Sequence, residues 1–543
     1  MRYNVRIMKS LCMLGRQPAI SLVELESLYG ADAITVLNDE VALVHAHPDI
    51  SRLGGTQKIA QLYSVTPEKG WQAIEDYLAH TLPTQLQDMP DRKIHLGFSV
   101  YGMDIAPKQL QRTGLTIKKA LKQAGRSVRV VPNKQAALSS AQVYHNHFTD
   151  ENGAEIIIAK GRDRQLYIGK TIAVQDIDAY RQRDQERPKR DAKVGMLPPK
   201  LAQIIVNLAV GPQAGKRLVA GSWRLVTGDE LERVSVSDVT PEESGQGLDE
   251  VQGSSDERNH ENSQGLDVMQ GKSEAQNGDG LSEVQGSSDE RVSRINHTVN
   301  ERVSVSDVTP EESGQGLDVT QGSSENSKEA VQYRTATAGR SDNAAIHQES
   351  LAQLAMPADK TTPLTVLDPF CGTGVILQET LLMHYPAYGT DIEPRMIDYS
   401  RQNLDWLNYD KSLPVQLEVA DATTHQWDSD KTPFDVIAAE SYLGRPFSSA
   451  PKPNVLEKVM QDVDTIHRKF LKNVAQQTKP GFRLCLAVPA WHVRGRVYHL
   501  KTLDSLEKLG YTRQSFVHAE DSDLVYRRPD QIVGRELTVL VRN

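Results

Sequence analysis

The C-terminal half of the sequence predicts an α/β fold with a mostly parallel β-sheet. From residue 364 onward, short apolar runs of the strand type alternate with longer segments whose apolar side chains recur at helical spacing. Most connections between these runs are long enough to hold a helix, which parallel strands require. Such a sheet is covered by helices on both faces, and ligands bind beyond the carboxyl ends of its strands.

Each predicted element of this half has a local signal. The strand at 364–370 is a Leu and Val run that ends at a proline, and two glycines separate it from the helix at 375–385. A helix at 394–410 opens with a proline, and apolar runs between the helices complete the sheet. The further predicted strands are 387–392, 415–423, 434–443, 482–492, 513–520 and 536–543, and the further helices are 454–477 and 503–510.

The N-terminal part is predicted to be mixed α/β, without that regular alternation. A helix is predicted at 21–30, where apolar residues recur at helical spacing up to a glycine, and another at 115–125, which also closes on a glycine. A third begins at Pro198 and Pro199 and continues to residue 210. The predicted strands are 33–37, 41–47, 93–102, 127–132, 154–160 and 165–174.

A segment of different composition lies between the two halves. Residues 228–330 contain no Phe, Tyr or Trp, and the stretch ERVSVSDVTPEESGQGLD begins at both Glu232 and Glu301. These repeats lack the apolar positions that allow solenoid repeats to bury a shared face. Because such a segment buries too little apolar surface to offset its ordering entropy, we expect a disordered acidic insertion over 228–350.

The net charge of −9 is unevenly distributed. The segment 228–330 carries 24 acidic and 7 basic residues, so the rest of the chain has a net charge of +8. Two basic stretches, at 108–134 and 181–193, concentrate this charge, and the first contains no Asp or Glu. Two such runs in one half favour contact with nucleic-acid phosphates over a merely solvated helix face. The predicted RNA contacts are Lys118, Lys119, Lys122, Arg126, Arg129, Arg187, Lys189 and Arg190.

Several other classes of protein lack support in the sequence. No apolar run approaches the roughly 20 residues that a membrane helix needs. The N-terminus is charged throughout, unlike a secretion signal. Because Cys12, Cys371 and Cys485 are far apart and the histidines are scattered, we expect neither a disulfide framework nor a metal site. These features indicate a cytoplasmic protein that needs no metal.

The turn after the first strand of the C-terminal half predicts a nucleotide-type ligand. Gly372 and Gly374 allow the backbone to turn sharply and to approach a ligand, and the next helix points its positive end at the same place. Asp368, at the end of the strand, is placed to accept a hydrogen bond from an ammonium group. A dinucleotide-binding turn would have a third glycine where this chain has Leu377.

The next two strands also end in acidic residues. Asp391 lies one βαβ step after the glycines, where a ribose diol needs an acceptor, although capping of the next helix is an alternative role. Asp421 is placed to accept from an adenine amine while the backbone of Ala422 contacts the ring. Three acids at successive strand ends predict a binding site for S-adenosylmethionine, and Phe370 and Ile392 complete the predicted set.

These motifs resemble those of a known family. LDPFCGTG at 367–374 and YGTDIEP at 388–394, with LGRQPAISLVELESLYG and GMLPPKLAQIIVNLA in the N-terminal half, are similar to the THUMP-associated tRNA guanine N2-methyltransferases, which modify guanine 10 of tRNA. The resemblance covers nearly everything except the insertion, and it implies an α+β THUMP-like region followed by a Rossmann-like class I methyltransferase domain. The implied parts are an N-terminal α/β domain at 1–90, a THUMP-like RNA-binding domain at 91–180, a linker and helix at 181–227, the insertion at 228–350 and the methyltransferase domain at 351–543.

The loop after the fourth strand departs from this family's pattern. There the family usually has Asp-Pro-Pro-Tyr, which holds the amine of the target guanine and stacks on the base. This chain has Glu440, Ser441 and Tyr442, so the acid is one methylene longer and both prolines are missing. We expect Glu440 and the Ser441 carbonyl to accept hydrogen bonds from the amine, with Tyr442 or Phe447 stacked on the base.

The expected activity is methyl transfer from S-adenosylmethionine to the N2 amine of a guanine in tRNA, and position 10 is implied by the resemblance. The enzyme would mainly supply alignment and a dry pocket, and the target base would turn out of the RNA to reach it. Two alternatives stay open: a tRNA-binding protein with a degenerate catalytic loop, and an amino-methyltransferase that acts on another nucleic acid. Some relatives need a small activating protein partner, and the sequence leaves this point open.

Overall fold

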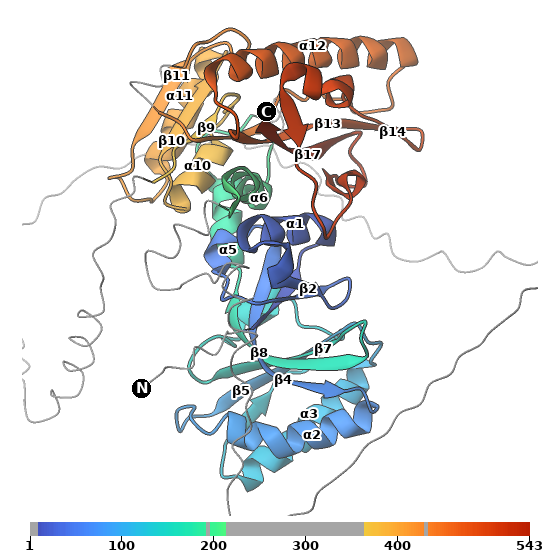
Figure 1. The fold of residues 1–543 in the computed structure, drawn as a ribbon. Helices are drawn as coiled ribbons and strands as arrows, with labels where there is room; N and C mark the ends of the chain where they lie inside the picture. Colours follow the sequence, from blue (N-terminus) through green and yellow to red (C-terminus); the bar gives the residue numbers. More distant parts are fainter. Residues whose placement is uncertain (1–8, 192–195, 213–362, 428–432) are drawn as a thin grey trace, which may run out of the picture. The chain divides into compact units, whose positions relative to one another are not determined.

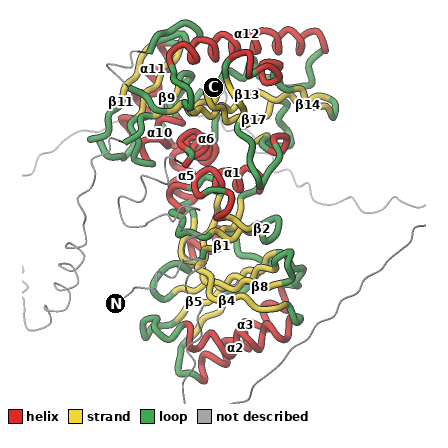
Figure 2. The backbone as a smooth tube through the Cα atoms, in the orientation of Figure 1, coloured by secondary structure: helices red, strands yellow, loops and turns green. Residues whose placement is uncertain are grey.

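Two β-sheets organise the chain, one in each half of the sequence (Figures 1 and 2). The computed structural model describes residues 9–191, 196–212, 363–427 and 433–543. The insertion expected at 228–350 therefore lies outside the described residues. All described residues belong to one compact unit.

The N-terminal sheet has eight strands in the order β2-β3-β1-β4-β8-β7-β5-β6. Neighbouring strands are antiparallel, except that β5 runs parallel to both β6 and β7. The strands are β1 Ser10–Leu14, β2 Ile34–Val36, β3 Val41–Val44, β4 Thr56–Pro67, β5 Ile94–Tyr101, β6 Val128–Val130, β7 Gly153–Lys160 and β8 Gln165–Val174. The sequence predicts a domain boundary at residue 90, and this one sheet contains strands from both sides of that residue. The division into two domains stays a prediction.

Six described α-helices accompany this sheet. They are α1 Pro18–Tyr29, α2 Trp71–Gln85, α3 Pro107–Gln123, α4 Ser140–His145, α5 Ile177–Arg181 and α6 Pro199–Val210. Helices α2 and α3 share one apolar core with β5 and β7, in which Leu78 and Ile117 are fully buried against strand residues such as Phe98. Their outer faces are polar, because the apolar residues of each helix recur on one side only.

The C-terminal sheet has the order β11-β10-β9-β12-β13-β17-β15, and β14 and β16 pair with β13 and β17. Its strands are β9 Val366–Asp368, β10 Ala387–Asp391, β11 Val415–Val419, β12 Val436–Glu440, β13 Arg483–Val493, β14 Arg496–Tyr498, β15 Tyr511–Arg513, β16 Val525–Tyr526 and β17 Val533–Arg542. The first five strands of this order are parallel, and β17 is antiparallel to β13. Because the strand order reverses direction after β9, the topological switch point lies between β9 and β12, where such sheets bind ligands.

Three described α-helices belong to this sheet: α10 Val375–Leu382, α11 Pro394–Trp406 and α12 Pro453–Gln477. The mostly parallel α/β architecture confirms the predicted fold class of the C-terminal half. Two elements differ from their predictions. The helix expected at 503–510 is a pair of 3₁₀ turns, and the strand expected at 513–520 ends at Arg513. The rest of that segment is held differently, because the backbone N–H groups of Val517 and His518 donate to the Glu26 carboxylate of α1.

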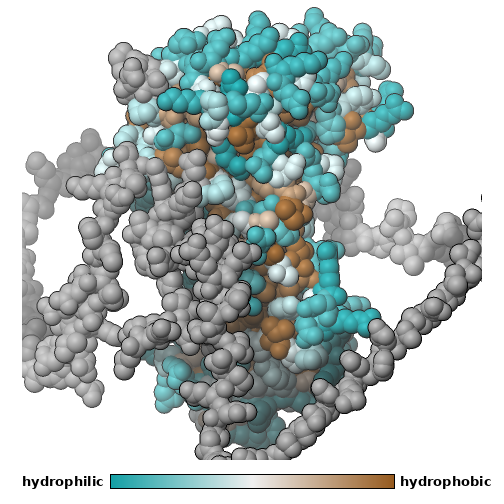
Figure 3. Space-filling view, in the orientation of Figure 1, coloured by the Kyte–Doolittle hydropathy of each residue, from teal (hydrophilic) through white to brown (hydrophobic). Residues whose placement is uncertain are grey.

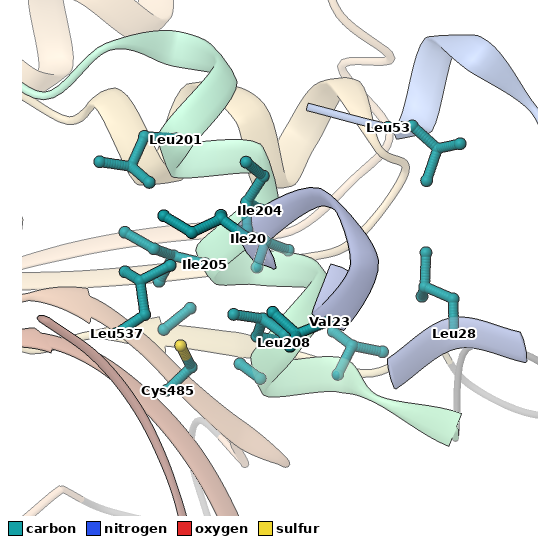
Figure 4. Packing of buried hydrophobic residues seen from close by; sticks show 14 of the residues in the cluster. Ile20, Val23, Leu28, Leu53, Leu201, Ile204, Ile205, Leu208, Cys485 and Leu537 are labelled. Carbon is teal, nitrogen blue, oxygen red and sulfur yellow. The ribbon is translucent and has the colours of Figure 1, made fainter. Parts of the chain in front are cut away.

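Helix α6 connects the cores of the two halves. Every residue of this helix except Lys200 is buried, and it contacts α1, α10, β12 and β13. A single apolar cluster therefore contains side chains of both halves (Figure 4). Its members include Ile20 and Val23 of α1, Ile205 and Leu208 of α6, Cys485 of β13 and Leu537 of β17.

A buried carboxylate reinforces this junction. Glu24 of α1 accepts hydrogen bonds from the backbone N–H groups of Gly54 and Gly55 at 2.9 and 2.7 Å, and from the Asn207 side chain of α6 at 2.7 Å. Burial raises the pKa of Glu24 to about 7. The polar contacts thus join three separate segments at the point where the N-terminal half meets the C-terminal domain.

None of the described helices combines the length and apolar character that crossing a membrane requires. Within the described residues, His, Cys, Asp and Glu side chains form no group of three or more that is arranged to hold a metal ion.

Candidate functional site

A cavity of about 790 Å³ lies at the carboxyl ends of the parallel strands. The three acids that the sequence predicts at successive strand ends, Asp368, Asp391 and Asp421, all line it, and so does Glu440 at the end of β12. The other predicted residues that line the cavity are Phe370, Gly372, Ile392, Ala422, Ser441 and Tyr442. The structure therefore brings almost the whole predicted site together, because the carboxyl ends of parallel strands meet at one edge of a sheet.

The glycine turn between β9 and α10 has the conformation that its residues predict. Gly374 occupies the N-cap of α10 with φ of 82°, a conformation that favours glycine. A Cβ at this position would lie 2.8 Å from the Ser400 hydroxyl oxygen. Ser400 donates to the Gly372 carbonyl at 2.8 Å, and the Asn403 amide of α11 donates to the Thr373 carbonyl, also at 2.8 Å. Helix α11 thus holds the turn in place, a role that the sequence did not predict.

Asp391 is fixed by two backbone donors. Its Oδ2 accepts from the Gly372 N–H and its Oδ1 from the Glu393 N–H, each at 2.9 Å. A carboxylate has about four lone-pair sites, so both oxygens keep acceptor capacity toward the cavity. The alternative role of Asp391 as a helix cap does not apply to α11, since the N-cap of that helix is Glu393.

Asp421 and Ile392 form the neighbouring part of the cavity. The Oδ1 of Asp421 accepts from the backbone N–H and the hydroxyl of Thr423, both at 2.8 Å, while its Oδ2 has no hydrogen-bond partner among the described residues. The Ile392 side chain is 62% exposed beside Asp391. An exposed apolar side chain and a carboxylate oxygen without a partner among the described residues, both lining one cavity, suit a flat ring that carries an amine.

The carboxyl groups of the cavity repel one another. Asp368 is 2% exposed, and burial, with smaller effects from the Asp391 and Glu440 carboxylates, holds its pKa well above the ordinary value. Burial also raises the pKa of Asp391. A ligand that brings positive charge into this cavity would relieve the repulsion and stabilise the ionised carboxylates.

The loop after β12 is held by two side chains that the sequence analysis did not identify. Arg535 of β17, itself 5% exposed, donates through its Nε to Oε1 of Glu440. Ser441 is buried, and its hydroxyl lies 2.7 Å from Nε2 of His467 on α12. Tyr442, in contrast, is 46% exposed at the cavity.

The tautomer of His467 follows from its contacts. Its Nδ1 lies 2.8 Å from the Val463 carbonyl, which accepts only, so Nδ1 carries the proton. Nε2 is then an acceptor facing the Ser441 hydroxyl, whose single proton is shared between Nε2 at 2.7 Å and the Ala487 carbonyl at 3.1 Å. Burial lowers the pKa of His467 to about 4, which keeps the ring neutral at physiological pH. His467 therefore contacts the loop after β12 through the Ser441 side chain and helps to position it.

We expect His467→Gln to flatten the dependence of stability on pH. The folded-state pKa of about 4 lies below the ordinary value, so the neutral ring contributes stability that is present above about pH 6.5 and is lost as the pH falls toward 4. The full effect amounts to roughly 3 kcal/mol, of which about 2 kcal/mol is lost between pH 7.5 and pH 5. Urea unfolding at pH 7.5 and pH 5 measures it, with the exposed His145→Gln as the matched control. An unchanged pH dependence in His467→Gln would contradict this role.

The predicted RNA contacts divide into three groups. Lys119, Lys122 and Arg129 are exposed, as is Arg190, and Lys118 and Lys189 are half-buried. Arg126 donates hydrogen bonds to the carbonyls of Gln87, Met89 and Pro90, so its guanidinium holds the loop after α2.

The structure corrects one member of the predicted RNA set. Arg187 is 3% exposed, and burial lowers the pKa of its guanidinium, while Asp184 and Glu379 interact with its charge. A side chain in this position cannot reach a phosphate from solvent. The basic composition of residues 181–193 did not predict the burial of Arg187, because charge alone does not show which side chains turn inward.

Comparison with known proteins agrees with the geometry of the cavity. Residues 360–526 match a family model that describes a methyltransferase domain. The C-terminal domain has the class I methyltransferase fold. S-adenosylmethionine is the cofactor of this domain. The residues present fit that cofactor, because the Asp391 carboxylate suits a ribose diol and the repelling acids suit a cationic sulfonium and ammonium.

Individual proteins give more distant similarities. A stretch of 124 residues is 27% identical to the tRNA (guanine(10)-N2)-dimethyltransferase of Methanothermobacter thermautotrophicus, and it covers 23% of this chain and about a third, 32%, of that protein. The crystal structure of TrmN from Thermus thermophilus gives a TM-score of 0.39 at 12% identity, covering 99% of this chain and 100% of that one. Magnesium protoporphyrin IX methyltransferase of Synechocystis gives a TM-score of 0.22 at 13% identity, covering 38% and 87%.

Proposed function

We propose that this protein transfers a methyl group from S-adenosylmethionine to the exocyclic N2 amine of a guanine in tRNA, with guanine 10 as the candidate position. The observation that carries the proposal is the carboxylate of Glu440 at the end of β12, in the same cavity as the three cofactor acids. The similarity to the tRNA (guanine(10)-N2)-dimethyltransferase of Methanothermobacter thermautotrophicus supports guanine N2 as the target. Bound S-adenosylmethionine supplies a methyl group on a sulfonium.

Glu440 provides the acceptor that a guanine amine needs. The lone pair of this amine is delocalised into the ring, so the enzyme must hold the amine in an orientation that exposes it. Arg535 engages Oε1 of Glu440, which leaves Oε2 to accept a hydrogen bond from the amine. The exposed Tyr442 ring offers a flat surface on which the base stacks. These roles of Glu440, Ser441 and Tyr442 are part of the proposal.

A row of cations on α3 supports an RNA partner. Lys108, Arg112, Lys119 and Lys122 are exposed and recur at helical spacing on the side of α3 opposite its buried residues. No Asp or Glu occurs from residue 108 to 134, so nothing on this segment neutralises the row. Such a row contacts phosphates without reading sequence. We propose that the region containing α3, predicted to be THUMP-like, holds the tRNA by its backbone.

The test is transfer of a tritiated methyl group to unmodified tRNA and to DNA, followed by nucleoside analysis of the product. Labelled N2-methylguanosine or N2,N2-dimethylguanosine from tRNA is the expected result. Labelled DNA, or another labelled nucleoside, would overturn the proposal, and tRNA binding without any transfer would indicate a degenerate enzyme.

A binding assay with the same tRNA distinguishes tRNA binding by the row of cations on α3 from cofactor binding by the C-terminal domain. We expect the triple variant Arg112→Gln, Lys119→Gln and Lys122→Gln to bind tRNA more weakly and to reduce the salt slope of binding by about 3, or about one for each phosphate that these side chains neutralise. Cofactor affinity should stay unchanged. The charge-conserving variant Arg112→Lys, Lys119→Arg and Lys122→Arg is the control and should bind tRNA as the wild type does.

A further inference from the structure

A second cavity lies beside the candidate active site and is lined by residues of α12 and of the hairpin formed by β13 and β14. Figure 1 shows these elements in the C-terminal half. Its volume is about 970 Å³, at the upper end of the range for ligand clefts. We call it the hairpin groove. Its lining consists of Pro451, Pro453, Leu456, Glu457, Met460, Gln461, Asp464, Thr465, Arg468, Val493, Arg494, Arg496, Tyr498, His499, Leu500 and Lys501.

The hairpin groove has an apolar floor and a cationic rim. Leu456, Val493 and Leu500 are buried and form the apolar part. On the rim, Arg494, Arg496 and Lys501 are exposed, and none of the three has an ion pair with a described residue. A rim of free cations over an apolar floor favours a ligand that carries both phosphates and flat apolar surfaces.

The acids of the groove do not cancel this charge. Asp464 is 6% exposed and is already engaged, because its carboxylate accepts from the Arg468 guanidinium and from the backbone N–H and hydroxyl of Thr502. Glu457 is exposed on α12. Apart from the Asp464–Arg468 pair, the groove therefore has three free cations against one free carboxylate. The surface over α12 is mostly hydrophilic (Figure 3).

The groove is continuous with the catalytic cavity along two elements. The segment from Glu440, the last residue of β12, to Pro446 lines the catalytic cavity. Pro451 of the following loop and Pro453, the first residue of α12, line the groove. Thr465 of α12 lines both spaces. A strand that leaves the catalytic cavity along this loop therefore reaches residues that line the groove.

We infer that the hairpin groove binds the RNA strand that flanks the target base, with phosphates on Arg494, Arg496 and Lys501 and a neighbouring base on Tyr498. This inference rests on the proposed function. When a base turns out of the RNA into the catalytic cavity, the phosphates on either side of it lie close to the protein. Cations near the cavity would stabilise the negative charge of these phosphates. Tyr498, half-buried at the rim, offers a ring for a base that no longer stacks on its neighbour in the RNA.

The test compares two charge reversals of equal size. The groove variant Arg496→Glu with Lys501→Glu is expected to raise the Kd for a fluorescein-labelled tRNA transcript at least about tenfold, and to reduce the salt slope by about 1.4, or about 0.7 for each single-strand phosphate. The control variant Lys479→Glu with Lys508→Glu changes two exposed lysines of the same domain that line neither cavity. It should bind the transcript as the wild type does.

The outcomes separate this inference from the proposed function. Cofactor affinity, measured by calorimetry, should be the same in all three proteins because the groove does not include the cofactor acids. An equal loss of tRNA affinity in both variants, or no loss in either, would overturn the groove assignment. Displacement of the transcript by poly-glutamate but not by single-stranded poly-uridylate would identify an acidic-peptide site and also overturn it. If the wild type binds tRNA through the groove but transfers no methyl group, the groove stands and the proposed activity fails.

Discussion

Replacing Asp391 with alanine is expected to raise the Kd for S-adenosylmethionine about a hundredfold, because the ribose diol would no longer donate hydrogen bonds to a charged acceptor. The carboxylate is already oriented by the Gly372 and Glu393 N–H groups, so it needs little reorganisation when the cofactor binds. Its removal also takes an acceptor from the Gly372 N–H and loosens the glycine turn. Both effects act in the same direction.

Calorimetric titration with S-adenosylmethionine and with its demethylated product measures this effect. Asp398→Ala is the matched control, because Asp398 is an exposed acid of the neighbouring helix α11 that hydrogen-bonds to Gln402 outside the cavity. Asp421→Ala should have a smaller effect than Asp391→Ala, since only one free carboxylate oxygen faces the cavity there. An Asp391→Ala variant that binds the cofactor with unchanged affinity would show that the ribose lies elsewhere.

The positions of the three acids in the cavity were predictable because Asp368 and Asp391 end strands β9 and β10, and Asp421 lies two residues after the end of β11. Asp368, Asp391 and Asp421 are widely separated in the chain, yet the alternation of strands and helices places all three at one edge of a parallel sheet. Gly374 was predictable for a similar local reason, since its left-handed backbone at the start of α10 favours a residue without Cβ. The alternation of strands and helices, together with the rule that ligands bind at the carboxyl ends of parallel strands, was enough to predict this part of the site.

The side chains that hold the loop after β12 were not predictable in the same way. Arg535 contacts Glu440 across 95 residues of sequence, and His467 contacts Ser441 across 26. The first contact depends on β17 lying antiparallel beside β13, where Arg535 pairs with Pro489. The pattern of apolar residues in the sequence does not predict the register between β13 and β17. A basic residue near the start of an apolar final strand is the signal that could have indicated it.

Some N-terminal elements were missed because their local patterns are weak. Strand β4 mixes buried and exposed residues irregularly over Thr56–Pro67, with bulges opposite both neighbouring strands, so strict alternation does not describe it. Helix α2 contains Pro83 near its end, and a proline inside a segment predicts the end of a helix. Both elements are stabilised by contacts with distant segments, and such contacts override local preference.

Replacing Glu440 with glutamine is expected to lower kcat for tRNA methylation at least about a hundredfold, the range seen when one preorganised polar group is removed from an active site. Glutamine has nearly the same shape, and its carbonyl oxygen would still accept from Arg535. Its amide nitrogen would then face the guanine amine, so two donors would oppose each other. Cofactor affinity should change far less than kcat, because Glu440 contributes only its charge to the cofactor site and is not among the proposed ribose, adenine or ammonium ligands.

Arg535 gives the second arm of this prediction, because it acts only by positioning Glu440. Arg535→Met should lower kcat with little change in the KM for tRNA, whereas Arg535→Lys should recover only part of the activity, since an ammonium cannot reproduce the directed Nε–H of the guanidinium. The measurement is steady-state tritium incorporation with calorimetric Kd values for the cofactor. If Glu440→Gln methylates tRNA at the wild-type rate, the amine is held by another group and the Ser441 carbonyl is the next residue to consider. If instead both Glu440→Gln and Arg535→Met lose cofactor binding, Glu440 belongs to the cofactor site and the proposed division between the three cofactor acids and the fourth acid is wrong.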